Sequence, residues 1–322
     1  MAKFIIRRLL QMIPLMLGVT FLSFAIVNLL PGNPFTTLAL NPKIKPGDIE
    51  MLERAYGLDK PWLERYVYWL GDLVRGDLGI SLTTRAPVLD RILNVLPNTI
   101  LLSATSLILA ILISIPLGIF SATRRNSLFD HIATITSVAI YGIPTFWLGL
   151  LLIILFSVKF REWGLPSLPV GGMEDLRDGG GFWDRVEHMI LPVLSLTIVQ
   201  IAGWTRYVRA SMLEVIQQDY IRTARAKGLE SRAVIYGHAF RNALLPLVTL
   251  IGLSIPDLVG GAFLIETLFA WNGIGRLAVD ATTKNDFPVV MGVTLMFAFL
   301  TMIGNLIADV LYGLLDPRIT YD

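Results

Sequence analysis

Side chains able to do chemistry are few and scattered in this sequence. Cysteine is absent, which excludes a thiolate nucleophile, a disulfide framework and a cysteine-ligated metal site. The three histidines, His131, His188 and His238, lack the His-Glu-x-x-His spacing of a zinc-binding helix. A Gly-x-Ser-x-Gly nucleophile elbow is missing as well. These patterns disfavour an enzyme, and we predict no catalytic residue, no metal site and no cofactor.

The sequence also lacks a phosphate-binding loop of the form Gly-x-x-x-x-Gly-Lys-Ser/Thr. Lys227-Gly228 has the reverse order, and the pair of glycines in Gly273-Ile274-Gly275 is more typical of a turn than of a nucleotide site. If the chain moves a solute against a gradient with ATP, we therefore expect a separate subunit to hydrolyse the ATP.

One carboxylate stands inside an apolar segment. Asp257 follows Pro256, which could kink a helix and open its backbone toward a cavity. A carboxylate at membrane depth is costly unless it faces water or a partner, so Asp257 is a candidate for lining a translocation pathway. The alternatives are that it reaches the outer interface or pairs with a neighbouring helix. We expect Glu266 and Asp309, near the ends of apolar segments, to reach the lipid headgroups.

Residues 219–229 form a short, basic stretch between two apolar segments. Ala224 and Ala226 favour a helix, and Lys227 lies in its last turn, where a cation interacts well with the helix dipole. Gly228 can supply a left-handed cap. The stretch therefore predicts a short helix that stops at Gly228. The simpler alternative is an ordinary basic loop, which any cytoplasmic connection between membrane helices tends to be.

Composition indicates a membrane protein. Hydrophobic residues make up 54% of the chain and charged residues only 16%, against roughly 25% in soluble domains. Residues 9–42, 92–123, 131–158 and 287–308 contain no Asp, Glu, Lys or Arg. Each stretch exceeds the roughly 20 residues needed to cross the hydrocarbon core. The net charge of +2 is too small to suggest nucleic-acid binding.

We predict six membrane-spanning helices, because a backbone in lipid must satisfy its own hydrogen bonds. Their approximate ranges are 5–30, 98–122, 132–158, 189–205, 242–265 and 287–312. Lys3, Arg7 and Arg8 precede the first apolar run, as in a signal peptide, but no small-residue cleavage site clearly closes it. We interpret this run as a retained first span.

A soluble-looking insertion with balanced charge separates the first two spans. In it, Trp62, Leu63, Tyr66, Leu70 and Leu73 recur at helical spacing, which predicts one or two amphipathic helices against the outer face of the membrane. The predicted organisation is a first transmembrane helix at 1–30, an extracytoplasmic insertion at 31–97, and a five-helix core at 98–322 with a cytoplasmic coupling loop at about 206–241.

The placement of Lys and Arg predicts the orientation of the chain. The N-terminus, the Arg124-Arg125 turn, the loop at 206–241 and the tail at Arg318 are basic, and they alternate with balanced or acidic segments. Because basic loops stay in the cytoplasm, we predict that both termini lie on the cytoplasmic side of the membrane.

The stretch at 219–229 resembles the EAA loop of ABC importer permeases, whose short helix docks into a groove on the ATP-hydrolysing subunit. Thr223, Ala224 and Gly228 match its small-residue and glycine positions. Arg222 replaces the glutamate of that motif, as in the dipeptide and oligopeptide permease branch.

Further motifs along the chain are similar to the first permease subunit of dipeptide and oligopeptide ABC importers. They are Leu30-Pro31-Gly32-Asn33-Pro34, Gly57-Leu58-Asp59-Lys60-Pro61, Gly76-Asp77-Leu78-Gly79-Ile80-Ser81, Pro144-Thr145-Phe146-Trp147, His188-Met189-Ile190-Leu191-Pro192, Arg241-Asn242-Ala243-Leu244-Leu245-Pro246 and Leu315-Asp316-Pro317-Arg318. So many motifs in one order indicate a resemblance over nearly the whole chain.

The resemblance implies an all-α, multi-pass protein of a bacterial or archaeal plasma (inner) membrane, with the type I ABC importer permease fold. It implies a peptide substrate, a second permease subunit in a heterodimer, two ATP-binding subunits and an extracytoplasmic solute-binding protein, with membrane lipid around the spans. The same scaffold could instead import nickel chelates, glutathione or oligosaccharides. An ion-coupled secondary transporter is the alternative of a different class, supported by Asp257 alone.

The resemblance also implies the residues that dock the ATPase. They are Tyr220, Thr223, Ala224, Lys227 and Gly228. In this scheme, closure of the ATPases on ATP pushes the short helix and switches the spans between inward-open and outward-open states.

Overall fold

The computed structural model describes residues 2–29, 47, 51, 59–175, 180–254 and 262–315. Over these residues the chain is helical, with one isolated β-bridge between Ile80 and Pro87. The helices are α1 (Ala2–Leu29), α4 (Trp62–Val74), α5 (Val88–Thr123), α6 (Leu128–Tyr141), α7 (Thr145–Leu152), η1 (Ile153–Lys159), α8 (Phe160–Glu162), α9 (Phe182–Ile216), α10 (Asp219–Ala226), η2 (Ala233–Phe240), α11 (Arg241–Leu253), α13 (Phe263–Leu268), α14 (Ile274–Thr283) and α15 (Phe287–Leu315), where η1 and η2 are π-helical.

Four of the described helices are long and apolar enough to cross a membrane. Their spanning stretches are Phe4–Leu29, Val88–Thr123, Phe182–Ile216 and Phe287–Val310. A fifth span results if the bent pair Leu128–Tyr141 and Thr145–Glu162 counts as one. The prediction of an all-α, multi-pass membrane protein is thereby confirmed, and the number of six spans stays a prediction.

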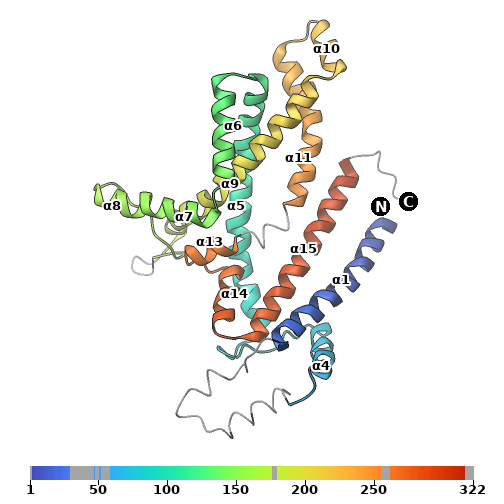
Figure 1. Cartoon of the computed structure of the whole chain (residues 1–322), viewed down its shortest axis with the longest axis vertical. Coiled ribbons are helices and arrows are strands. Elements are labelled where there is room, and N and C mark those ends of the chain that lie inside the picture. Colours follow the sequence, from blue (N-terminus) through green and yellow to red (C-terminus); the bar gives the residue numbers. More distant parts are fainter. Residues whose placement is uncertain are drawn as a thin grey trace.

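The predicted continuous third span is wrong, because the chain bends by 103° between α6 and the helices that follow it. Gly142 caps α6, and Pro144 is the N-cap of α7. Proline disfavours the helical conformation for the residue before it, so a helix often ends there and a new one can begin in a new direction. Figure 1 shows α7 and α8 projecting sideways from the upright α6.

Other boundaries also differ from the predicted ranges. The predicted fourth span was too short, since α9 continues from Phe182 to Ile216, and α5 begins at Val88 rather than near residue 98. In the region of the predicted fifth span the structure describes α11 and α13, and residues 255–261 lie outside the described part. Asp257 is among them, so its predicted role is untested.

The predicted amphipathic helix in the insertion is present as α4, and it packs against α1. Tyr66 makes edge-to-face ring contacts with Phe21 and Phe24, each with centroids 5.5 Å apart. The Tyr66 hydroxyl lies 3.0 Å from that of Thr20. Aromatic pairs of this geometry stabilise contacts beyond the burial of area, so α4 is fixed to the first span.

The long helices α5 and α9 pack closely and form the centre of the molecule, with α6 and α7 against α9 and with α15 against both α1 and α11. Figure 1 places α10 at one end, beyond the turn between α5 and α6, and places α4 and α14 at the other. The beginning of α1 and the end of α15 both point toward the α10 end. Arg8 and Asp309 of these two helices form an ion pair of 3.0 Å. Asp309 therefore has a protein partner as well as the expected position near a span end.

Candidate functional site

The short helix α10 ends in a glycine cap, as the sequence predicts. Lys227 is the C-cap, and Gly228 has φ of +78°. The Gly228 N–H donates to the Arg225 carbonyl (3.0 Å), and the Leu229 N–H donates to the Ala224 carbonyl (3.4 Å). This pair of bonds is a Schellman motif, which satisfies carbonyls that would otherwise lack a partner. A Cβ on Gly228 would meet no atom within 4 Å, so only the backbone conformation requires glycine here.

One face of α10 is buried in the chain and the other is exposed. Ile221 and Ala224 are 0% and 8% exposed and face inward. The predicted docking residues that remain exposed are Tyr220, Thr223, Lys227 and Gly228. Ala224, the fifth of the predicted set, instead belongs to the contact between α10 and the rest of the chain.

The buried face of α10 joins a hydrophobic cluster, called here the coupling cluster, that draws on four other elements. Its members besides Ile221 and Ala224 are Ile119 and Ala122 of α5, Val208 and Met212 of α9, Val234 and Ala239 of η2, and Ala243 and Leu247 of α11. The Asn242 side-chain amide also donates to the Tyr220 hydroxyl (3.0 Å). The buried face of α10 therefore packs directly against four other elements, and close-packed interiors transmit strain.

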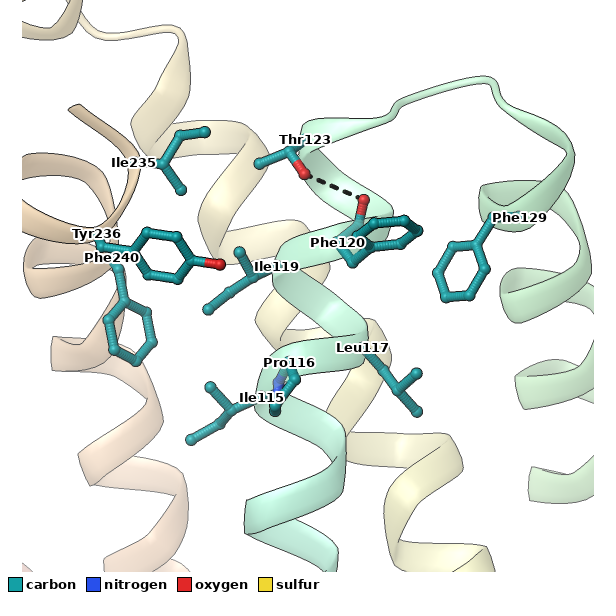
Figure 2. A pocket seen from close by; sticks show the side chains of 10 residues that line it. All are labelled: Ile115, Pro116, Leu117, Ile119, Phe120, Thr123, Phe129, Ile235, Tyr236 and Phe240. Atoms are coloured by element: carbon teal, nitrogen blue, oxygen red, sulfur yellow. Dashed lines mark hydrogen bonds between the residues drawn. The ribbon is translucent and has the colours of Figure 1, made fainter. Parts of the chain in front are cut away.

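An apolar hollow of about 540 Å³ opens beside the coupling cluster, between α5, the start of α6 and η2. Figure 2 shows Ile119 of α5 facing Tyr236 and Phe240 of η2, whereas Phe120 points to the other side of α5, toward Phe129 of α6. Ile119 belongs both to the hollow and to the cluster. The packing between α5 and η2 is therefore incomplete on this side, whereas α9 fills the opposite one.

A largely buried ion pair connects α9 to the first turn of α6. Arg209 donates from Nε and Nη2 to the two carboxylate oxygens of Asp130, at 2.6 and 2.8 Å. The Ser121 hydroxyl and the Asn126 N–H (3.0 Å) also donate to this carboxylate. Asp130 is only 2% exposed, and the planar fork of arginine matches its geometry. Sequence reasoning missed this pair, although an acidic residue at the start of an apolar segment signals a need for a partner.

Glu266 lies buried at the opposite end, and the expectation that it reaches headgroups is wrong. It is 0% exposed. The Thr99 hydroxyl donates to one oxygen (2.6 Å), and the N–H groups of Gly275 and Arg276 donate to the other (2.7 and 3.3 Å). These N–H groups begin α14, where a helix favours a negative charge. A Cβ at Gly273 would overlap the carboxyl group, so this glycine permits its close approach.

Asp286, between α14 and α15, is a second buried carboxylate at that end. The hydroxyls of Ser81 and Thr83 donate to it at 2.5 and 2.7 Å, and the Leu82 N–H donates at 2.9 Å. Burial raises the pKa of Asp286, but these hydrogen bonds lower it by more, so its pKa lies below the ordinary value. Arg91 lies 3.5 Å away. The carboxylate thus ties the end of the insertion to the start of the last span.

The described residues contain no group of three or more His, Asp or Glu side chains able to hold a metal ion. The arrangement at α10 is a capped helix with an exposed polar face, held by its apolar face against α5, α9, η2 and α11.

Comparison with known proteins identifies the family. Residues 114–321 match the family described as "Binding-protein-dependent transport system inner membrane component", and residues 1–103 match the N-terminal family of the same systems. The chain belongs to this family. It is thus a multi-pass inner-membrane component of a transport system that works with other subunits, and the resemblance to ABC importer permeases is confirmed.

Full-length relatives carry related names. The chain is 47% identical over 322 residues to the oligopeptide transport system permease protein AppB of Bacillus subtilis (strain 168), with all of both chains covered. It is 41% identical over 340 residues to the dipeptide transport system permease protein DppB of Escherichia coli (strain K12), covering 100% of this chain and 99% of the relative. It is 37% identical over 321 residues to the glutathione transport system permease protein GsiC of Escherichia coli O6:H1, with all of both chains covered.

Proposed function

We propose that the chain is the transmembrane permease subunit of an ATP-driven importer of dipeptides and oligopeptides. The full-length identity of 47% and 41% to permeases named for these substrates supports the substrate class. In this proposal the chain forms half of the translocation pathway. A second permease subunit forms the other half, two ATP-binding subunits supply the energy, and an extracytoplasmic solute-binding protein delivers the peptide.

The observation that carries the proposed mechanism is the two-faced helix α10. Its exposed residues Tyr220, Thr223, Lys227 and Gly228 contact the ATP-binding subunit, while Ile221 and Ala224 hold it in the coupling cluster. When ATP closes the ATP-binding subunits, they displace α10. The cluster then carries α5, α9 and α11 along as a unit, which switches the side on which the pathway opens.

The proposed topology has six spans with both termini in the cytoplasm and the insertion at 31–97 outside. The basic Arg124-Arg125 turn and α10 lie at one end of the structure, toward which the beginning of α1 and the end of α15 also point (Figure 1). Basic segments favour the cytoplasmic side, which supports placing this end inside.

Asp257 keeps its proposed role as a residue lining the pathway. Asp257→Asn should then change the uptake of cationic peptides more than that of neutral peptides, because only the former gain from a negative charge. Equal effects on lysyl-alanine and dialanine uptake would assign Asp257 a structural role instead.

Glutathione is a second candidate substrate, favoured by the 37% identity to GsiC over the whole chain. Competition separates the two candidates. If an excess of dialanine inhibits the uptake of labelled trialanine and an excess of glutathione does not, the dipeptide and oligopeptide assignment stands.

The test of the proposed function is purification of the tagged chain from its native membrane in a mild detergent, followed by mass spectrometry and reconstitution. We expect a second multi-pass permease and a subunit with a phosphate-binding loop to copurify. The reconstituted complex, with its binding protein, should take up trialanine only with ATP. Recovery of this chain alone, active without ATP and sensitive to collapse of the proton gradient, would contradict the proposal and indicate ion coupling.

A further inference from the structure

A polar pocket separate from the coupling cluster lies between α6 and α9. Its volume is about 490 Å³. The residues that give it its chemistry are Arg206, Arg209, Tyr207, Tyr141, Thr134 and Ala210. The Arg206 guanidinium carbon lies 5.9 Å from the centre of the Tyr141 ring, within the range of a cation–π contact. The pocket therefore combines two cations with aromatic and hydroxyl groups.

Arg206 and Arg209 lie one turn apart on α9 but face different parts of α6. Tyr141 is the last of the 14 residues of α6, so it lies about 20 Å along the helix axis from the turn at the α10 end. Arg209, by contrast, pairs with Asp130 in the first turn of α6. The Arg206 guanidinium therefore lies beside the far end of α6, away from the carboxylate that Arg209 binds.

The positive charge of Arg206 is not balanced within the described part of the chain. The carboxylate of Asp130 is taken by Arg209 with two hydrogen bonds. No carboxylate of the residues that the structure describes lies within the 4.0 Å of an ion pair from Arg206. The Arg206 side chain is exposed to the pocket. Arg206 thus has no carboxylate partner among the described residues, and the site is complementary to a bound anion.

We propose that this pocket is a transient binding site for the α-carboxylate of a peptide in transit, with Arg206 as its bidentate partner. The inference rests on the proposed peptide-import function. The planar fork of arginine matches a carboxylate. A peptide of any sequence carries this one group, so a site that recognises it serves substrates with different side chains. The tyrosines Tyr141 and Tyr207 provide surfaces for the terminal residue, and the cavity volume lies in the range of small-ligand sites.

The test uses the complete complex in liposomes and a single reporter cysteine. The chain has no cysteine of its own, so Ala210→Cys places one thiol in the pocket. We would measure how fast a small methanethiosulfonate reagent modifies this thiol during ATP hydrolysis, with and without trialanine and the binding protein. Trialanine should slow the modification several-fold. Arg206→Gln should remove this protection, and Arg206→Lys should keep part of it because the charge remains without the fork.

Transport provides the second readout. Arg206→Gln removes the charge-assisted hydrogen bonds to the carboxylate, so it should lower trialanine uptake by about tenfold or more. The matched control is Arg125→Gln, which removes an exposed arginine from the α5–α6 turn and should leave both protection and uptake within twofold.

Three results would overturn the inference. Protection in Arg206→Gln equal to that of the wild type would remove Arg206 from the site. Protection that follows the phosphatidylglycerol content of the liposomes, without trialanine, would assign the pocket to an anionic lipid headgroup. Full uptake by Arg206→Gln would show that the contact is not used. Uptake of trialanine by the wild-type complex distinguishes this inference from the proposed function. If the wild type takes up trialanine in an ATP-dependent way, such results refute only the role of the pocket. If the wild type does not take up trialanine, the proposed import function fails as well.

Discussion

The two ends of the molecule hold buried carboxylates in different ways. At the α10 end, Asp130 binds mainly side chains, Arg209 and Ser121, that come from other helices. At the other end, Glu266 binds backbone N–H groups that begin α14. Bonds between side chains can break and re-form as helices shift, whereas displacement of the Glu266 carboxylate would leave two buried N–H groups in the first turn of α14 without an acceptor. The difference suits an α10 end that moves and an opposite end that stays fixed.

The largest loss of stability should come from Glu266→Ala. The substitution leaves a void and removes the partner of the Thr99 hydroxyl and of two N–H groups, which should cost about 3 kcal/mol. Thermal unfolding of the detergent-purified protein measures the effect. The control Glu187→Ala removes an exposed glutamate of α9 and should change stability by less than about 0.5 kcal/mol. Equal melting temperatures for the two variants would refute the structural role of Glu266.

A smaller loss of stability is expected from Arg209→Ala. Asp130 would lose its cation while it stays buried, but Ser121 and Asn126 would still donate to it, so we expect about 2 kcal/mol. Arg209→Lys should recover part of this, because lysine keeps the charge and loses the two-point geometry. Arg222→Ala, at an arginine 77% exposed, is the control for the same unfolding measurement. A loss for Arg209→Ala above that for Glu266→Ala would reverse the comparison between the two ends.

The smallest effect, and one that depends on pH, should come from Asp286→Asn. Because the folded-state pKa of Asp286 is lowered, its charged form stabilises the fold above the unfolded pKa, and this contribution is lost as the pH falls through the folded value. At pH 7 we expect Asp286→Asn to lower the free energy of unfolding by about 1 kcal/mol. The difference in melting temperature from the wild type should shrink as the pH falls below 3.8, the ordinary value. A difference that stays constant down to low pH would exclude this cause.

Sequence reasoning succeeded where the determining interactions are local. The helix α10 and its end were predictable because Gly228 and the residues just before it make the cap among themselves. The helix α4 was predictable because its apolar residues recur within one segment. The first and last spans, α1 and α15, follow from apolar runs that nothing interrupts.

The remaining features depend on residues far apart in the chain. Arg206 and Arg209 suggested a loop, yet α9 continues through both. The partner of Arg209 is Asp130, which lies 79 residues before it in the chain. The role of Glu266 depends on Thr99, 167 residues away. The burial of Ala224 depends on α5, α9 and η2 packing around α10, which a single-segment pattern does not show.

The central claim is that α10 couples ATP hydrolysis to transport, and Gly228→Glu tests it most directly. Gly164→Glu is the matched control: both glycines have positive φ and open space around a Cβ, so strain and added charge are the same. The measurement is trialanine taken up per ATP hydrolysed by the reconstituted complex. We predict that Gly228→Glu lowers this ratio about tenfold with normal membrane levels, and that Gly164→Glu keeps the wild-type ratio. A wild-type ratio for Gly228→Glu would contradict the account.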